Sequence, residues 1–370
     1  MYRTRFILIG VFLSFFALIG ACSHPTVPSG PRFSGRLLVL ATLNTDSQDE
    51  QADLVEITAG PNSTFNRSTI TTGIIEAVAS PDQTQLLYAT KDGIALRGLR
   101  SGEVKELVKG ENYCLAWSPD GKRFSYKQRS EPRKTKYFAS DLNGKTTVVW
   151  EDLFADNRTV NQGSLHLAPD TTGCAQWVAS NKLIFDRMGP SQKRGTDVKP
   201  NTTTLAVLDD SVKLTDTDKK WSVEGICERG TAFLRSQEGE ILIAKSLENL
   251  KTANPTPGPC SSCRFVGFAA KSCVPFFVED SSSTSSELFY LNPANWQRQR
   301  STHVGQPFSV TARMLINSAA RLMVAGDVPA SLWLIDAETG DITPFFPKPG
   351  EPMMSDGSLR NPRPVVWIEK

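Results

Sequence analysis

Cysteines are the side chains in this sequence whose type and spacing point most directly to chemistry. The 370-residue chain has seven of them, and three fall close together as Cys260, Cys263 and Cys273. Such a group can form a structural disulfide, act as a redox pair or bind zinc. A redox CxxC needs a surrounding βαβ unit, which the flanking residues do not predict, and zinc needs a fourth ligand, for which His303 is the only histidine candidate. We therefore predict a structural disulfide within this cluster, with no metal and no cofactor bound.

Three further cysteines occupy similar positions in consecutive segments of the chain. Cys114, Cys174 and Cys227 each stand just before or within a predicted strand. A disulfide between neighbours would explain this spacing, and so would small buried thiols near a molecular axis. The sequence leaves these two interpretations open.

Residues for nucleophilic or acid–base catalysis do not form a recognisable set. The chain contains only three histidines, and it has no Gly-x-Ser-x-Gly motif. Several aspartates recur at regular places, which is typical of residues that cap turns. A carboxylate pair for hydrolase or lyase chemistry depends on distance in space, so this chemistry stays as the alternative function, and we assign no catalytic residue. The regularly placed aspartates are Asp82, Asp120, Asp141 and Asp336.

The start of the chain has the layout of an export signal. Two arginines precede an almost wholly apolar run at 6–18, which is shorter than the ~20 residues that a membrane-spanning helix needs. The next four residues, Ile-Gly-Ala-Cys at 19–22, resemble the lipobox of bacterial lipoprotein signal peptides, in which the cysteine is acylated and becomes the new N-terminus. We expect a lipoprotein signal peptide at 1–21 and lipidation of Cys22. The alternative is an ordinary secretory signal whose cysteine is incidental.

A spacer separates this signal from the rest of the chain. The residues that follow Cys22 are rich in proline and glycine, which block both helices and central strands. We therefore predict a lipidated and extended tether at 22–35 and a folded domain at 36–370. Ser23, rather than an aspartate, follows the cysteine, which resembles the outer-membrane sorting pattern of enteric bacteria.

The charge balance excludes one class of partner. Lysine and arginine number 41 and aspartate and glutamate 39, and removal of the signal with its two arginines brings the chain close to neutrality. A neutral protein has no overall electrostatic attraction to a polyanion. We expect no nucleic acid partner.

Self-similarity is the strongest indication of the fold. The segments VASPDQTQLLYAT (78–90) and AWSPDGKRFSYK (116–127) each predict two strands joined by a tight turn with Pro and Asp at its centre. Weaker copies recur, and a second hairpin follows most of them, at intervals typical of propeller blades. First strands are expected near positions 77, 115, 176, 226, 266, 312 and 365.

The two ends of the chain complete one repeat between them. The strands at 35–43, 52–60 and 67–73 lack a first strand of their own, and PVVWI at 364–368 can supply it. Sharing a blade between the termini removes exposed sheet edges. We predict an all-β fold, a β-propeller of seven four-stranded blades with six as the rival number. Pairing of the C-terminal strand with the N-terminal blade would close it.

The AWSPDGKRFSY segment, with its weaker copy ASPDQTQLLYA, resembles the repeat of TolB-like and WD-repeat-like bacterial β-propellers. This resemblance covers most of residues 36–370 and implies a β-propeller fold, but says little about function. The family includes periplasmic binding and assembly proteins and propeller domains attached to peptidases. The small α/β domain that precedes the TolB propeller is missing here, so the role of TolB is not carried over.

Tryptophans mark equivalent places in the repeat. Trp117 and Trp177 hold matching first-strand positions, and Trp367 lies in the terminal strand. Propellers pack such residues between blades, so we expect all three to be part of the core.

A long insertion interrupts the repeat at 151–173 and is the predicted binding loop. We expect an envelope lipoprotein that binds a protein or another ligand and is held at the membrane by its lipid. The predicted location is the outer membrane of a bacterial cell, facing the periplasm or the cell surface. The candidate binding residues are Phe154, Asn157, Arg158 and His166.

Overall fold

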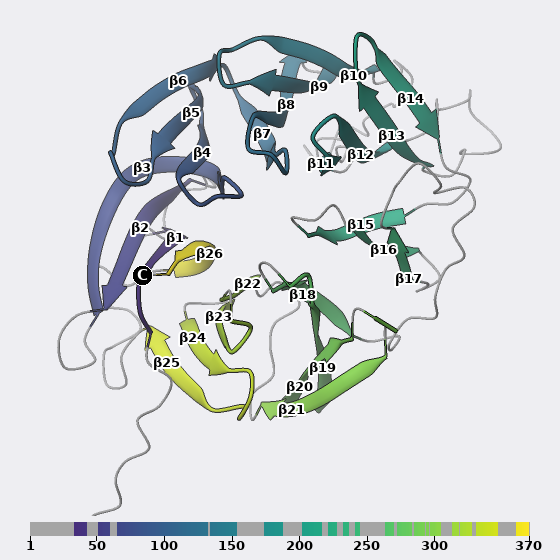
Figure 1. The fold of residues 1–370 in the computed structure, drawn as a ribbon. Helices are drawn as coiled ribbons and strands as arrows, with labels where there is room; N and C mark the ends of the chain where they lie inside the picture. The colour runs from purple at the N-terminus through teal and green to yellow at the C-terminus, as the bar shows by residue number, and fades with distance from the viewer. Residues whose placement is uncertain are drawn as a thin grey trace, which may run out of the picture.

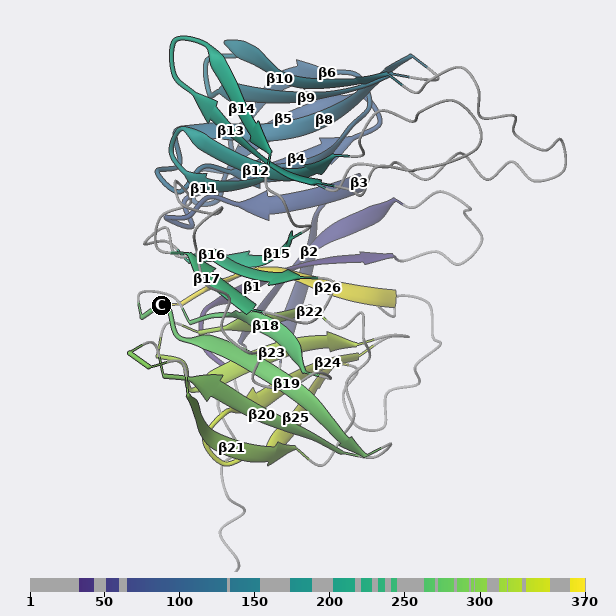
Figure 2. The ribbon, with the colours of Figure 1, turned by 90° about the vertical axis from the view of Figure 1, so that its right-hand side faces the viewer.

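The computed structural model consists of β-sheets arranged around a common centre (Figure 1). All regular secondary structure in the residues that it describes is β-strand, so the predicted all-β class is confirmed. Figure 2 shows the sheets from the side, stacked face to face. The structure describes residues 33–42, 51–59, 65–131, 134–153, 174–187, 202–216, 221–227, 232–236, 241–244, 263–269, 272–282, 285–292, 294–295, 297–304, 313–317, 319–327, 331–346 and 360–369.

The described strands form six antiparallel sheets, which are numbered here in chain order. The first sheet has the order β26-β1-β2-β3-β4-β5-β6 and contains β1 (Arg36–Thr42), β2 (Ala52–Ala59), β3 (Phe65–Ala79), β4 (Gln85–Thr90), β5 (Gly93–Gly98), β6 (Val104–Lys109) and β26 (Arg360–Ile368). The second contains β7 (Asn112–Trp117), β8 (Arg123–Glu131), β9 (Lys134–Asp141) and β10 (Thr146–Leu153). The third contains β11 (Gln176–Ala179), β12 (Lys182–Arg187), β13 (Thr202–Leu208) and β14 (Val212–Asp216).

The remaining sheets follow the same sequential order. The fourth contains β15 (Trp221–Ile226), β16 (Ala232–Ser236) and β17 (Ile241–Ala244). The fifth contains β18 (Arg264–Phe268), β19 (Pro275–Ser282), β20 (Ser285–Leu291) and β21 (Arg298–Val304). The sixth contains β22 (Arg313–Ile316), β23 (Leu322–Asp327), β24 (Ser331–Asp336) and β25 (Ile342–Phe346). The strand rhythm that the sequence predicts is therefore present in every described part of the chain.

Strand β3 belongs to two neighbouring repeats at once. Its first half, from Phe65, pairs with β2, and its second half, from Ile74 to Ala79, pairs with β4. The ladder register shifts on both sides of the junction, which lets one strand turn from one set of partners to the other. The sequence predicts two separate strands here, and the structure has one of 15 residues.

The C-terminal strand lies beside the first strand of the chain (Figure 1). Strand β26 pairs with β1 from Arg36↔Ile368 to Thr42↔Arg360. Trp367 stacks on Phe33, with 5.4 Å between ring centroids, and its Nε1 donates to Ser34 O at 2.9 Å. The first strand that the N-terminal hairpin lacks is thus supplied by the other end of the chain.

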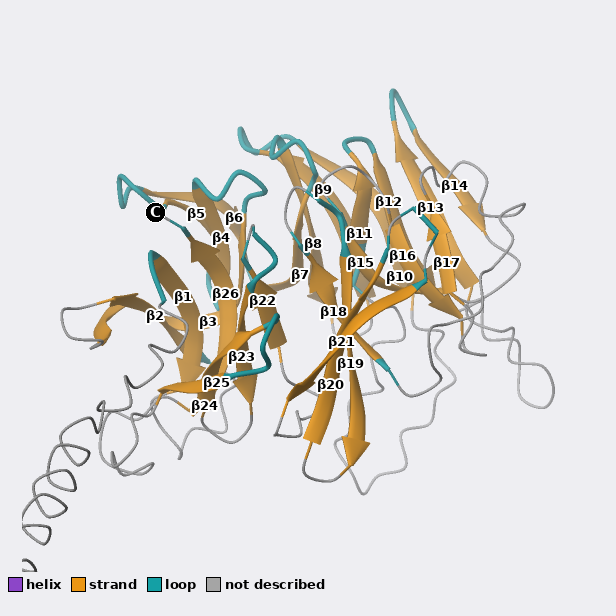
Figure 3. Ribbon diagram, turned by 60° about the horizontal axis from the view of Figure 1, so that its bottom comes forward, coloured by secondary structure: helices purple, strands orange, loops and turns teal. Residues whose placement is uncertain are grey.

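Several hairpin turns share one hydrogen-bond pattern, and Figure 3 shows them as short teal connections. In the first, Ser80 N donates to Gln85 O at 2.8 Å and Gln83 N donates to Ser80 O at 2.9 Å. The same two bonds recur in the turns that begin at Ser118 and Asn317. The side-chain oxygen of the first residue accepts further hydrogen bonds from backbone amides, which is why serine and asparagine occur at this position.

Apolar side chains from neighbouring sheets pack against each other and form the core. Trp117 and Trp177 are buried at two of these contacts, as the repeat predicts. Trp117 Nε1 donates to Val78 O of the first sheet at 3.1 Å, and Trp177 Nε1 donates to Ala116 O of the second at 3.2 Å. Each indole therefore fills the space between two sheets and also bonds to the neighbouring backbone.

Two disulfides join neighbouring sheets at their inner strands. Cys114 of β7 is bonded to Cys174, just before β11, with a Cα–Cα distance of 5.1 Å. Cys227, after β15, is bonded to Cys273, which lies between β18 and β19, with a Cα–Cα distance of 5.5 Å. Of the two interpretations that the sequence leaves open for the first pair, the structure has the disulfide.

Candidate functional site

The innermost strands of the first, fifth and sixth sheets line a cavity that is open to solvent. Strands β18, β22 and β26 face the central space of the molecule (Figure 1), and β3 contacts β26, β26 contacts β22, and β22 contacts β18. A cavity of about 460 Å³ lies among these four strands. Arg264 is the one lining residue whose side chain is not apolar, and the lining consists of Ala77, Val78, Ala79, Arg264, Phe265, Val266, Met314, Leu315, Pro364 and Val365.

A smaller recess of about 170 Å³ adjoins this cavity. The two share Ala77, Pro364 and Val365 in their linings, so they form one continuous site, here called the channel cavity. The recess brings in two charged side chains, Glu76 of β3 and Arg363 of β26.

The charges of the channel cavity are unequally distributed. Glu76 and Arg363 line the recess together, and Glu76 Oε2 also accepts a hydrogen bond from Leu115 N at 3.1 Å. Arg264 is the one charged side chain in the lining of the larger part.

An aromatic cluster holds one wall of the cavity in place. The ring of Phe265 stacks on Phe233 at 5.1 Å between centroids and makes edge contacts with Phe268 and Phe277. Gly225 of β15 lies directly against this ring, since an added Cβ there would collide with it. The ring is therefore fixed from several sides, and the wall is pre-formed.

A second hollow, of about 790 Å³, lies between turns of the second and third sheets. Two of its three acidic groups are engaged at those turns: Asp141 Oδ1 accepts the amides of Asn143 and Lys145, both at 2.9 Å, and Asp209 Oδ1 accepts from Asn181 Nδ2 at 2.7 Å. The amide of Lys145 is the main cause that lowers the pKa of Asp141. These contacts explain the hollow as a surface between capped turns.

The regularly placed aspartates cap turns, as predicted. Asp82 accepts from the Ser80 hydroxyl at 2.6 Å, and this bond is the main cause that lowers its pKa. For Asp120, partial burial acts to raise the pKa, but the hydroxyl of Ser118 and the amide of Lys122 outweigh it, and the pKa is lowered. Carboxylates held in this way are structural.

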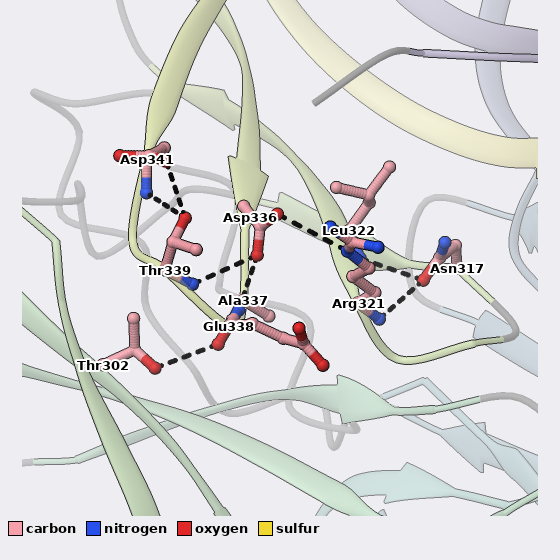
Figure 4. A network of polar contacts seen from close by, with 9 residues as sticks. All are labelled: Thr302, Asn317, Arg321, Leu322, Asp336, Ala337, Glu338, Thr339 and Asp341. Atoms are coloured by element: carbon pink, nitrogen blue, oxygen red, sulfur yellow. Dashed lines mark hydrogen bonds and ion pairs between the residues drawn. The ribbon is translucent and has the colours of Figure 1, made fainter. Parts of the chain in front are cut away.

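Asp336 has the same role in the sixth sheet (Figure 4). Its Oδ1 accepts the amides of Glu338 at 2.8 Å and Thr339 at 3.1 Å, and its Oδ2 lies 3.6 Å from Arg321 Nε. Thr302 of β21 donates its hydroxyl to Ala337 O at 2.9 Å, which ties this turn to the fifth sheet. The turn thus fixes one sheet against the next.

Part of the predicted site lies outside the described residues. This is the case for the lipidation site Cys22, for the whole candidate loop of Phe154, Asn157, Arg158 and His166, and for Cys260. Cys263 is buried and disulfide-bonded. Cys273 pairs outside the cluster, with Cys227, because the turn between β18 and β19 lies beside the end of β15. The disulfide expected within the cluster stays a prediction.

Sequence reasoning missed the channel cavity and its two arginines. Arg264 follows a cysteine, and Arg363 lies between two prolines, so neither belongs to a motif. Their position in first strands was the only available signal, because first strands line the centre of a propeller.

Two further features concern the described residues as a whole. They contain no place where three or more histidine, cysteine or acidic side chains meet as metal ligands. None of their elements is a helix of the length and apolarity needed to cross a membrane.

Comparisons with known proteins identify the fold. No protein-family model matches the sequence, and no curated protein matches it either. The β-propeller domain of the Trilobed protease from Pyrococcus furiosus superposes with a TM-score of 0.50 at 11% identity, over 85% of this chain and 100% of that one. The acylaminoacyl peptidase of Pyrococcus horikoshii superposes with a TM-score of 0.50 at 11% identity, over 85% of this chain and 53% of that one. A prolyl endopeptidase superposes with a TM-score of 0.50 at 13% identity, over 85% of this chain and 48% of that one.

The chain spans about half the length of these two peptidases. At such low identity the likeness shows the fold alone, and this fold is a β-propeller.

Proposed function

We propose that this protein is a binding module of the bacterial envelope, a propeller that takes a ligand in its channel cavity. The observation that carries this proposal is the cavity of about 460 Å³, whose lining side chains are apolar apart from Arg264. Ligand sites are typically concave and pre-formed, with an apolar lining and a few polar groups that orient the ligand. The hollow between the second and third sheets lacks this character, since mainly polar and charged side chains line it.

The propeller has seven blades in this proposal. The two halves of β3 divide the first sheet into two four-stranded units, and the other five sheets supply one blade each. Clusters of buried apolar side chains support a complete ring, because they join each unit to the next. A further cluster joins β23 and β24 of the sixth sheet to β1, β2 and β26 of the first sheet. It includes Val324, Leu334 and Trp367.

A lipid on Cys22 anchors the propeller to the outer membrane, facing the periplasm or the cell surface, and the tether to residue 35 separates the two. The two inter-sheet disulfides support an extracytoplasmic location, since disulfides persist in oxidising compartments. A fatty-acid probe should label the wild-type protein and leave Cys22→Ser unlabelled. Failure of the wild type to take up the probe would contradict the anchor.

Binding accounts for the cavity better than hydrolase or lyase chemistry does. Catalysis by carboxylates needs two of them on either side of the substrate bond. The channel cavity has one acid in its described lining, Glu76, and that carboxylate accepts the amide of Leu115. No step of such a reaction is assigned here.

A neutral fluorescent probe tests the site. N-phenyl-1-naphthylamine brightens in apolar cavities, and we expect the wild type to bind it saturably. Leu315→Trp fills the cavity and should abolish this binding, while Val212→Trp, which fills the other hollow, should leave it unchanged. Thermal melting of both variants controls for folding. The opposite pattern, with loss only in Val212→Trp, would refute the channel cavity as the ligand site.

A further inference from the structure

We infer that the disulfide between Cys114 and Cys174 is a redox switch: a dithiol of another protein opens it, and its opening lowers the ligand affinity of the channel cavity. Two properties of the bond carry this inference, its accessibility and its connection to the cavity. Only the second rests on the proposed function, since a cavity without a ligand could not be regulated.

The two described inter-sheet disulfides differ in their exposure to solvent. Cys174 is exposed and its partner Cys114 is buried, whereas both cysteines of the other bond are buried, Cys227 at 3% and Cys273 at 8% exposure. Thiol–disulfide exchange begins when a thiolate reaches one of the two sulfurs, so its rate depends on access. Cys174 offers such an entry point, and the bond between the fourth and fifth sheets does not.

The exchange passes two electrons from the dithiol to this bond. A thiolate of the dithiol attacks Sγ of Cys174, which breaks the bond to Cys114 and releases that sulfur as a thiolate. The second thiol then attacks the sulfur of its own molecule in the mixed disulfide and releases the thiolate of Cys174. The two protons of the dithiol pass to the two cysteines by way of water, and the dithiol becomes a disulfide.

A β-bulge in β7 holds Cys114 in an unusual backbone conformation. The register between β7 and β8 shifts between Tyr113 and Ala116, which leaves Cys114 and Leu115 in the bulge. Cys114 has a φ of 61°, in the left-handed region that a residue with a side chain rarely adopts. Its bond to Cys174 helps to hold this conformation, and cleavage of the bond lets Cys114 relax towards the negative φ of an ordinary strand residue.

The same bulge makes the contact that reaches the cavity. Leu115 N donates to Glu76 Oε2 of β3 at 3.1 Å, and Glu76 lines the recess of the channel cavity. A single peptide unit joins Cys114 to Leu115, so a change in the backbone of Cys114 turns the N–H of Leu115 away from the carboxylate. Strand β7 therefore connects a disulfide to the third sheet with a hydrogen bond to the first.

Loss of this hydrogen bond disfavours an apolar ligand. The amide of Leu115 orients one oxygen of the Glu76 carboxylate, and an oxygen that loses such a donor recovers hydrogen bonds from water. The recess shares three lining residues with the larger part of the cavity, so additional water in the recess lies beside the ligand. We therefore expect the reduced protein to bind neutral apolar ligands more weakly.

Partial reduction followed by alkylation tests the accessibility of the bond. Native protein is treated with low concentrations of dithiothreitol, trapped with N-ethylmaleimide at set times and digested, and mass spectrometry locates the modified cysteines. We expect Cys114 and Cys174 to be modified about tenfold or more faster than the buried pair, because access limits the exchange. In urea-unfolded protein this difference should disappear. Equal rates in the native protein, or earlier modification of the buried pair, would overturn the switch.

Binding of N-phenyl-1-naphthylamine tests the connection to the cavity. Protein in which only Cys114 and Cys174 are reduced should bind the probe about fivefold or more weakly than the oxidised protein, at the lower end of the usual coupling between two sites. Reoxidation should restore the affinity. The double variant Cys114→Ser/Cys174→Ser should bind like the reduced protein without any reductant, and thermal melting controls for its folding.

Variants of two acids locate the route. Glu76→Ala removes the acceptor in both redox states, so the affinities of the two states should become equal. Glu111→Ala, which removes an exposed acid just before β7, is the matched control and should retain the difference. A difference that persisted in Glu76→Ala would overturn the route through the recess.

The two measurements fail in different ways. Equal probe affinity of the oxidised and the selectively reduced wild type would overturn the regulation of the cavity while the proposed function stood. No probe binding by the oxidised protein would overturn the proposed function and the regulation with it, and the order of reduction would still decide whether the bond is reactive.

Discussion

Single residues in the turns show how the sequence adapts one local geometry. Gln83 and Gly121 hold the same place in two copies of the turn, with φ of 56° and 68°. This left-handed backbone costs about 1–2 kcal/mol for a residue with a side chain, whereas glycine loses about 0.5–1 kcal/mol in entropy when it is ordered. Glycine is therefore the better residue at this position, and glutamine is tolerated.

The first prediction exchanges these two residues. Gln83→Gly should raise the free energy of unfolding by about 0.5–1 kcal/mol, and Gly121→Gln should lower it by a similar amount. Urea denaturation with the same m-value for all variants measures both effects. Changes of equal sign in the two variants would contradict the shared geometry.

The capping aspartates make stability depend on pH. The hydroxyl of Ser80 holds the pKa of Asp82 below its ordinary value, and the folded pKa therefore lies below that of the unfolded chain. Asp82 contributes stability above about pH 4, and this contribution is lost as the pH falls through the folded pKa. We expect the melting temperature to fall on acidification and Asp82→Asn to make that fall shallower. Ser80→Ala, which removes the main cause, should have the same effect on the pH profile; a profile identical to that of the wild type in both variants would exclude this role.

At the scale of elements, close contacts between strands shape the cavity wall. Gly225→Ala in β15 would press a Cβ against the Phe265 ring, and overpacking of this kind costs about 1–3 kcal/mol. The ring would be pushed from its place among Phe233 and Phe277, so probe binding should weaken as well.

Phe265→Leu provides the matched control for this contact, because it removes the ring atoms that the new Cβ would meet. In the double variant the cost of Gly225→Ala should largely disappear, which chemical denaturation of the four proteins measures. Additive costs would show that the strain lies elsewhere.

Disulfides join elements that are distant in sequence. Cys114 and Cys174 are separated by 60 residues, so their bond restricts a long loop of the unfolded chain. Replacement of both by serine should lower the free energy of unfolding by about 2–4 kcal/mol. Calorimetry of the double variant, with and without reductant, measures this loss of stability. Reductant should also lower the melting temperature of the wild type. A wild type that melts identically in both conditions would contradict the bridge.

The elements divide into those that the sequence predicts and those that it does not. The turns at Ser80 and Ser118 could be predicted because their chemistry is local, and the tryptophans because they repeat. The partner of Cys273 and the cavity at Arg264 could not, because both depend on which strands of different sheets lie side by side in the fold. A single sequence without a motif carries no record of such contacts.

At the scale of the whole molecule, β26 holds the two ends of the chain together. It pairs with β1 along its length, and its side chains enter two core clusters, one through Trp367 and the other through Val366. Contacts with β22, β23 and β24 connect it to the sixth sheet. β26 is an edge strand that also packs on the sixth sheet, so its loss would remove its ladder with β1 and would also uncover the apolar side chains of two clusters.

Removal of residues 360–370 tests this role. The truncated protein should lose most of its stability, because the edge of β1 and the apolar surfaces of two clusters become exposed to water. A synthetic peptide of residues 359–370, added in excess, should restore the melting transition by pairing with β1, as an added strand completes a sheet. A peptide of the same composition in scrambled order is the control and should have no effect. If the truncated protein melted like the full chain, or if the scrambled peptide restored it equally well, β26 would be an addition to a ring that the other strands already complete.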